Sequence, residues 1–166
     1  MDQVRNFGFL LKNVSRKYSL RFERQTQEML LKYSNCKALA YLERNEGVSQ
    51  SKLAELTEID PMTMVRILDR MEADGLVERR PDLSDRRARC LYLTPNSKPV
   101  LDEIWQIAEQ IYSEIFAETS QAERDVFLDV LGRINRNLSL HELGSEKAEH
   151  GGETIGKSAG SKRGRS

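Results

Sequence analysis

Hydrophobic residues recur at intervals of three and four over most of the chain, a spacing that places them on one face of an α-helix. Roughly the first thirty residues show this spacing most clearly, and they predict one long amphipathic helix with polar residues on its other face. The apolar positions of this segment are Phe7, Leu10, Leu11, Val14, Tyr18, Phe22 and Met29.

Three shorter helices are predicted over about 35–44, 49–56 and 60–74, and the residues at their ends support these limits. Ser49 can accept a hydrogen bond from a free backbone amide at the start of the second of them. Asp60–Pro61 starts the third, since the carboxylate accepts from the first amides and proline needs no amide partner at the first helical position. A glycine shortly after the first and third of these helices marks their ends.

After the last of these helices the pattern changes to an alternation of period two, which is typical of β-strands. Two strands are predicted, over 76–80 and 89–93. The charged segment between them, 81–88, is expected to form the loop of a hairpin.

Two further helices are expected after the hairpin. Thr94–Pro95 combines a cap with a proline and predicts the start of the first, although Pro99 should bend or delay it because proline lacks an amide hydrogen. A capping box at 120–123 starts the second, whose apolar residues continue to Leu138. From Leu143 onward the composition shifts to glycine, serine, lysine and glutamate, which predicts disorder.

Composition narrows the class of protein. The 166 residues leave room for one compact domain and a tail, and 31% of them are charged, as in a helical protein with much exposed surface. No apolar run is long enough to span a bilayer and the N-terminus lacks a signal-peptide core, so we expect no membrane association and a cytoplasmic location. The two cysteines fit no metal-ligand spacing and no disulfide framework, and neither cofactor nor metal is expected.

The net charge is zero, but charges of opposite sign are concentrated in different segments. Residues 79–89 contain five arginines and two aspartates, whereas residues 102–129 contain eight acidic residues and one arginine. The chain can therefore present one basic surface to DNA while it stays neutral as a whole.

The helices predicted over 49–56 and 60–74 are joined by a short link and form a helix-turn-helix pair. In such a pair the second helix enters the major groove by its N-terminal end. Met62 can contact a thymine methyl group there, Thr63 can bond a base edge or a phosphate, and Arg66 can reach a guanine edge or the backbone.

The alternative is that the two helices form only a small helical hairpin within an all-α core. The residues expected to hold the second helix from the inside are Ile59, Val65, Leu68 and Met71.

The hairpin that follows favours DNA binding. Its loop carries Asp85, Arg86 and Arg87, and a guanidinium fits the narrow, negatively polarised minor groove. The Asp85 carboxylate can hold a neighbouring arginine in a fixed direction. A basic hairpin directly after a helix-turn-helix pair is the winged-helix arrangement. The residues expected to contact DNA are Ser49, Gln50, Met62, Thr63, Arg66, Arg70, Asp85, Arg86, Arg87 and Arg89.

The sequence resembles the MarR/SlyA family of bacterial regulators over about residues 5–140, in the order of its elements as well as in its motifs. The segments that carry the resemblance are 48–56, 65–79, 85–89 and 93–95. The strongest motif is the Asp-x-Arg of the wing, at Asp85 and Arg87, and several matched features in one order are more specific than any short motif.

The resemblance implies a mainly α fold with a small β-hairpin wing, in a homodimer that binds double-stranded DNA at a pseudo-palindromic operator and commonly represses transcription. Residues 1–34 and 96–140 would form the dimer body and 35–95 the winged helix-turn-helix lobe. The composition of the C-terminal segment, and not the resemblance, assigns 141–166 to a disordered tail. Met62, Thr63 and Arg66 match recognition-helix contacts, and Arg86 and Arg87 match wing contacts. A small aromatic or phenolic acid is the implied effector, in the cleft between lobes.

Dimerisation is also expected from the residues themselves. The helices at both ends of the chain carry apolar stripes wider than one small lobe can cover, and these stripes would form a large sticky patch if exposed. Pairing across a two-fold axis buries them and places two recognition helices about one DNA turn apart. Burial within a monomeric six-helix core is the alternative.

Other functions are less favoured. An enzyme is disfavoured because His141 and His150 are the only histidines and the chain has no glycine-rich phosphate loop or nucleophile elbow. A winged helix used only for protein contacts is disfavoured by the arginines of the wing and of the recognition helix. A redox switch at Cys36 or Cys90 is less favoured than inert burial, since one lies near apolar neighbours on a helix and the other within a strand.

Overall fold

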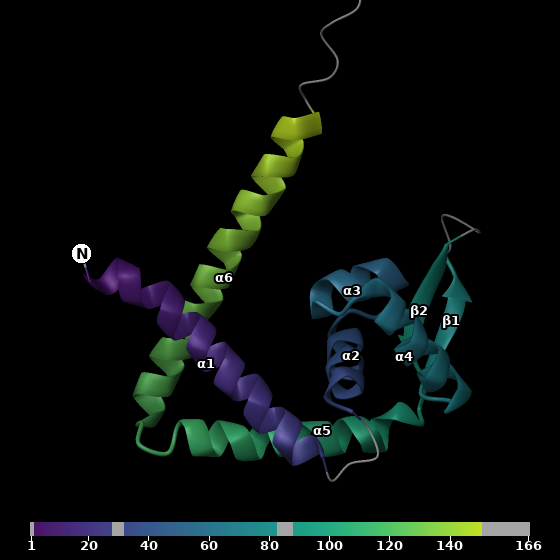
Figure 1. Ribbon diagram of the computed structural model, residues 1–166, viewed down its shortest axis with the longest axis horizontal. Helices are drawn as coiled ribbons and strands as arrows, with labels where there is room; N and C mark the ends of the chain where they lie inside the picture. Colours follow the sequence, from purple (N-terminus) through teal and green to yellow (C-terminus); the bar gives the residue numbers. More distant parts are fainter. Residues whose placement is uncertain (1, 28–31, 83–87, 151–166) are drawn as a thin grey trace, which may run out of the picture. The chain divides into compact units, whose positions relative to one another are not determined.

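The computed structural model describes residues 2–27, 32–82 and 88–150, in six α-helices and one two-stranded antiparallel hairpin (Figure 1). This arrangement confirms the predicted fold class. The chain divides after Ile115 into two compact units. The elements are α1 (Asp2–Thr26), α2 (Tyr33–Arg44), α3 (Gln50–Thr57), α4 (Pro61–Ala73), β1 (Val77–Pro81), β2 (Arg89–Leu93), α5 (Ser97–Ile115) and α6 (Gln121–His150).

The helix starts predicted from capping residues are confirmed at α3, α4 and α6. Ser49 Oγ accepts from the amide of Lys52 at 3.2 Å, and Asp60 Oδ1 accepts from the amide of Thr63 at 3.0 Å. At α6, Ser120 and Glu123 bond reciprocally, as a capping box requires. These side chains satisfy backbone amides that have no partner within the helix, and so fix where each helix begins.

The core of the first unit lies where α2, α3, α4, the hairpin and α5 meet. Leu68 and Met71 are buried as expected, but Val65 and Ile59 are only half-buried. Met64, absent from the expected set, is fully buried instead. The largest fully buried side chains include Leu39, Leu42, Leu53, Met64, Leu68, Met71, Leu91, Ile104 and Ile111.

The hairpin is fixed to the helix-turn-helix pair through its second strand. β1 and β2 pair with Val77 opposite Leu93. β2 also bonds the segment before α3, since the amide of Leu91 donates to the carbonyl of Val48 and the amide of Gly47 donates to the carbonyl of Leu91, both at 2.9 Å. Gly47 has a φ of +86°, a left-handed conformation that glycine adopts without strain.

α5 begins two residues later than predicted from Thr94–Pro95. A helix that began at Pro95 would need an amide hydrogen from Pro99, which proline lacks. With the start at Ser97, Pro99 lies in the first turn, where amides have no intrahelical partner. Thr94 Oγ1 still accepts from the amide of Asn96 at 3.2 Å.

α6 runs to His150, beyond the predicted start of the disordered tail at residue 141. The extension contains several strong helix formers, among them Glu142, Glu146, Lys147 and Ala148, and their propensity favours continuation of the helix. The remainder of the predicted tail, 151–166, lies outside the described residues. Within the described residues, no helix is both long and apolar enough to cross a membrane.

Candidate nucleic-acid interface

The first turns of α4 present three different kinds of side chain on an exposed surface. Met62 is 66% exposed, and Thr63 and Arg66 are exposed as well. Thr63 Oγ1 donates to Asp60 Oδ1 at 3.3 Å, which orients its hydroxyl beside the cap. Arg66 has no ion-pair or hydrogen-bond partner among the described residues. The start of this helix therefore offers a methyl, a hydroxyl and an uncommitted guanidinium together.

The two predicted contacts at the start of α3 are engaged within the protein. Ser49 Oγ is the N-cap of α3 and lies 3.0 Å from Ser51 Oγ. Gln50 Oε1 accepts from Arg79 Nη2 at 3.3 Å. Both residues are half-buried, so their side chains hold the local structure and offer less surface to a partner than the start of α4 does.

The remaining predicted contacts are spread over α4 and the hairpin. Arg70, three-quarters exposed, forms a long ion pair with Asp74 at 3.6 Å. Arg89 is exposed at the beginning of β2, opposite Pro81. The loop residues Asp85, Arg86 and Arg87 lie outside the described residues.

Two of the five arginines counted in the basic segment already have acidic partners. Arg79 forms ion pairs with Asp69, at 2.7 Å, and with Glu72. Arg80 pairs with Glu78 and lies over the ring of Tyr92, with 4.4 Å between the guanidinium carbon and the ring centroid. The excess of positive charge read from the sequence is therefore smaller than the count of arginines indicates. Local spacing gives no sign of the Arg79 pairs, because their carboxylates belong to another element.

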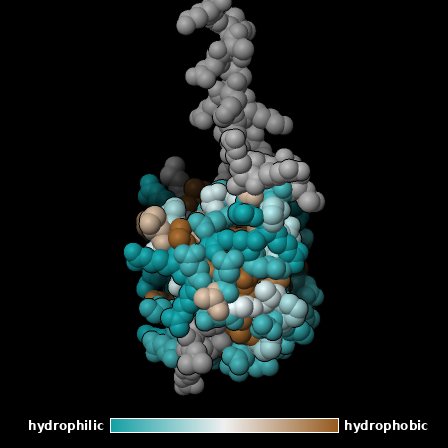
Figure 2. Space-filling view, turned by 90° about the vertical axis from the view of Figure 1, so that its right-hand side faces the viewer, coloured by the Kyte–Doolittle hydropathy of each residue, from teal (hydrophilic) through white to brown (hydrophobic). Residues whose placement is uncertain are grey.

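Figure 2 views the side of the molecule that carries the hairpin in Figure 1, and hydrophilic residues cover most of the surface visible there. The hydrophobic areas between them are small. A polar face around an exposed helix start suits a charged, hydrated partner better than an apolar one.

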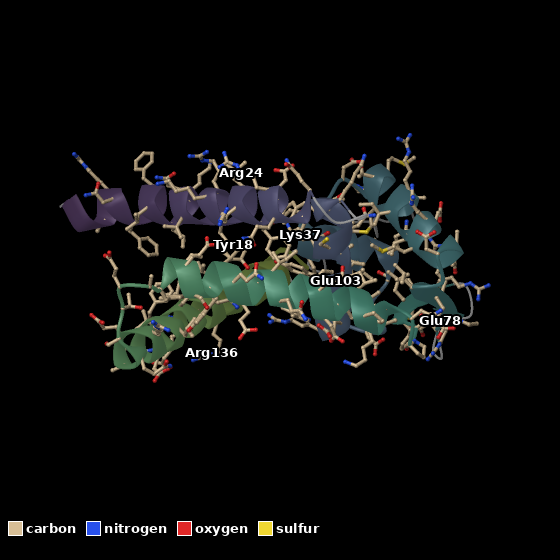
Figure 3. All side chains as sticks on the ribbon, turned by 90° about the horizontal axis from the view of Figure 1, so that it is seen from below. Tyr18, Arg24, Lys37, Glu78, Glu103 and Arg136 are labelled. Carbon is tan, nitrogen blue, oxygen red and sulfur yellow. The ribbon has the colours of Figure 1, made fainter. Side chains whose placement is uncertain are left out.

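A cavity of about 470 Å³ lies beside the winged lobe, between α1, α2 and α5. Its lining includes Tyr18 of α1 and Lys37 of α2, both labelled in Figure 3. Trp105 contributes from α5, where its Nε1 donates to Glu43 Oε2 at 2.8 Å and its ring lies under Arg44, 5.3 Å from the guanidinium carbon. The lining also includes Phe22, Tyr33, Tyr41, Leu56 and Glu58.

The cavity combines aromatic faces with positive charge. Burial, with a smaller contribution from Tyr33, raises the pKa of Tyr18, so its hydroxyl stays a neutral donor at physiological pH. Lys37 lies 5.9 Å from the centroid of the Tyr41 ring, and Arg44 also faces the cavity. Such a lining can hold a flat molecule with an anionic or hydroxyl substituent.

Both cysteines are buried and neither is poised to react. Burial is the main cause that raises the pKa of Cys36, which lines the cavity, to about 11. Cys90 donates to Asp82 Oδ2 at 3.2 Å, and this bond together with burial raises its pKa. Because the thiolate is the reactive form, these settings favour inert thiols, as expected from the sequence. No group of metal-binding side chains occurs among the described residues.

Two short helices joined by a tight turn, the second exposed at its start, followed at once by an antiparallel hairpin, define a winged helix-turn-helix protein. The sequence profile of the MarR family matches residues 31–88, which span α2, α3, α4 and the hairpin up to the start of β2. The chain belongs to the MarR family and is a transcriptional regulator.

Relatives with known names or structures agree with this assignment. A putative regulatory protein for the hcr operon of Thauera aromatica is 33% identical over 101 residues, and the match spans 61% of each chain. The crystal structure of a transcriptional regulator named PA3341 is 30% identical, with a TM-score of 0.68 and coverage of 80% of this chain and 98% of that one.

A third relative is BpsR of Bordetella bronchiseptica, a protein whose DNA binding is regulated by 6-hydroxynicotinic acid. It is 25% identical, has a TM-score of 0.63, and is matched over 78% of this chain and 98% of its own. The first two of these relatives are named as transcriptional regulators, and the chain, as a member of the MarR family, is a regulator and not an enzyme.

Proposed function

We propose that this protein binds double-stranded DNA sequence-specifically as a homodimer and represses transcription until a small molecule releases it. The exposed start of α4, with Met62, Thr63 and Arg66 free to meet base edges, is the observation that carries the proposal. A helix presented in this way fits the major groove by its N-terminal end.

Each side chain of the proposed interface suits a different part of the DNA. Arg66 has the reach and the uncommitted donors to bond a guanine edge, Thr63 can bond a base or a phosphate, and Met62 can pack on a thymine methyl group. Arg70 and Arg89 are exposed and suit phosphate contacts. Arg86 and Arg87 remain our proposed minor-groove contacts, and we propose that Asp85 holds a neighbouring arginine in a fixed direction.

Ser49 and Gln50 remain part of the proposed interface through the start of α3. Their side chains are committed to the cap and to Arg79, so we assign them a role in fixing the backbone near a phosphate. A backbone amide at a helix start can meet a phosphate oxygen while the side chain stays in place.

Exposed apolar side chains support the dimer. Along α1, Val4, Phe9 and Leu10 are 84%, 80% and 64% exposed, and along α6, Val126 and Leu138 are 64% and 59% exposed. Single exposed hydrophobic residues are normal, but long rows of them on terminal helices mark an interaction surface. We assign these rows, within 1–34 and 96–140, to contact with a second copy of the chain.

The cavity between α1, α2 and α5 is the proposed effector site. Its aromatic walls and the cations Lys37 and Arg44 suit an aromatic or phenolic acid, a class to which the ligand of the relative BpsR belongs. Leu56 and Glu58 of the lining adjoin the turn before α4, so a bound molecule touches the segment that sets the direction of the recognition helix.

Selection of bound duplexes from a random-sequence pool tests the proposal directly. We expect one enriched motif with two half-sites about one helical turn apart. Arg66→Ala should weaken binding to the enriched duplex by about 1–3 kcal/mol and relax the base preference at one position of each half-site. Gln106→Ala, on the exposed surface of α5, is the control and should bind as wild type does. No enrichment, with no binding to any duplex in low salt, contradicts the proposal.

Salt dependence separates this function from that of a winged helix used only for protein contacts. Each phosphate contact lowers the logarithm of the binding constant by roughly 0.9 per tenfold rise in salt. We expect Arg87→Ala to reduce this slope by about 1. A slope near zero in the wild-type protein contradicts DNA binding through the arginines.

A further inference from the structure

Arg79 joins three elements of the winged lobe. It extends from β1, and its Nη2 donates to Asp69 Oδ1 of α4 at 2.7 Å and to Gln50 Oε1 of α3 at 3.3 Å. Its Nη1 bonds Glu72 of α4, and its backbone amide donates to Glu72 Oε1 at 3.3 Å. One guanidinium thus ties the first strand of the wing to both helices of the helix-turn-helix pair.

The neighbouring arginines make no comparable connection within the described residues. The side chain of Arg79 is 21% exposed, whereas that of Arg80 is 54% exposed, forms an ion pair with Glu78 of its own strand and lies over the ring of Tyr92 in β2. Arg70 pairs with Asp74 at the end of its own helix. Exposed ion pairs within one element contribute little to stability. A partly enclosed guanidinium with partners on separate elements, by contrast, restricts how those elements move.

The shape of guanidinium is needed for this connection. It holds five N–H donors in one plane and can serve several acceptors in fixed directions. The ammonium of lysine is a compact point charge without that fork. Asp69 and Glu72 are three residues apart on α4 and carry like charges on one face, so without a cation between them they also repel each other.

We propose that Arg79 is a positioning residue for DNA recognition, which holds α4 at a fixed angle to the wing without touching DNA. This inference rests on the proposed function. Base readout requires that the recognition helix fits the major groove while the wing fits the minor groove. Attraction to phosphates, by contrast, depends chiefly on the number of cations. Arg79 therefore governs the preference for the specific site more than the affinity for arbitrary DNA.

Arg79→Lys tests the proposal because it keeps the charge and removes the fork. The probes are a duplex selected by the wild-type protein from a random pool and a shuffled duplex of the same length. We expect about tenfold weaker binding to the selected duplex, equivalent to about one mismatched base pair, with the shuffled duplex bound as before. Arg80→Lys, in the next position of the same strand, is the control and should bind both duplexes normally.

Direct contact between Arg79 and a phosphate would give a different result. Lysine binds phosphate well as a point charge, so a contacting residue would be rescued by this change. If Arg79→Lys binds both duplexes with wild-type affinity and salt slope, the proposal is wrong. Equal losses of affinity for both duplexes also contradict the proposal, because a general loss of folded protein would lower both affinities alike.

Asp69→Asn provides a second, independent test at a side chain that is 60% exposed. The change makes the lobe more positive, so electrostatics alone predicts tighter binding to every duplex. We expect weaker binding to the selected duplex together with equal or tighter binding to the shuffled one. Tighter binding to both overturns the proposal. A wild-type protein that prefers no selected duplex refutes the proposed DNA-binding function itself, whatever the variants do.

Discussion

Cys36 shows how position within the fold controls the chemistry of one residue. Its side chain is 1% exposed within the core, yet it also lines the cavity, so a bound effector would lie close to a thiol. Because burial raises its pKa to about 11, the thiol remains protonated and a poor nucleophile at physiological pH. The raised pKa of Cys36 therefore argues against regulation by oxidation at this residue.

The raised pKa of Cys36 predicts a specific loss of stability in alkali. An unfolded thiol ionises from its ordinary value of 9.0, whereas the folded one stays neutral to about 11. The folded state is therefore favoured fully below pH 9 and loses this advantage as the pH rises towards 11. Urea unfolding of the wild type and Cys36→Ala, at about pH 8 and about pH 10.5, should show a smaller alkaline loss in the variant. Equal losses in the two proteins would show that Cys36 ionises freely.

The sequence shows which residues of α4 are apolar, but their spacing does not fully determine which of them are buried. Met62, Met64, Val65, Ile67 and Leu68 cover more than one face of a single helix. The sequence predicted Val65 and Leu68 as inward-facing, and the structure buries Met64, Ile67 and Leu68 while Val65 is half-buried. The rotation of the helix about its axis is decided by its neighbours, and this cannot be read from its own residues.

At the scale of elements, the cap of the recognition helix is the feature most open to a direct test. Asp60 Oδ1 accepts from both the amide and the hydroxyl of Thr63. We expect Asp60→Ala to lower the free energy of unfolding by about 0.5–2 kcal/mol, because it leaves a helical amide without its acceptor. Asp60→Asn keeps a carbonyl oxygen and should retain most of that stability. Chemical denaturation measures both, and equal losses in the two variants would argue against the cap.

Helix starts could be predicted more reliably than other features because they depend on neighbours in sequence. Ser49, Asp60 and Ser120 each accept from an amide three residues ahead, and their signals are correspondingly local. No comparable local signal predicts the end of α6 at His150. The Arg79 connection could not be predicted either, because β1, α3 and α4 meet only after folding.

At the scale of the whole chain, charge pairing and apolar exposure separate two kinds of surface. Several basic residues of the winged lobe are balanced by nearby carboxylates, whereas Arg66, on the recognition helix, has no such partner among the described side chains. Rows of exposed apolar residues occur on α1 and on α6. A protein of zero net charge can thus carry a DNA-binding surface and a self-association surface without attracting nucleic acid everywhere.

The apolar rows predict that charge on α1 or α6 breaks the dimer without unfolding the chain. Leu10 and Val126 are each 64% exposed, so Leu10→Glu or Val126→Glu costs the folded monomer little. A carboxylate buried in a subunit interface without a partner is unfavourable by several kcal/mol. Sedimentation equilibrium should show a dimer for the wild type and a monomer for each variant, while circular dichroism stays unchanged.

Gln106→Glu, which adds the same charge on the exposed surface of α5, is the matched control and should remain dimeric. In the proposed homodimer, assembly and DNA binding are linked, because two lobes on one body would bind the second half-site as an intramolecular event. We expect each monomeric variant to lose roughly a hundredfold or more in affinity for a two-half-site duplex, and little for a single half-site. Equal affinity of dimer and monomer for the full site would mean that each lobe acts alone.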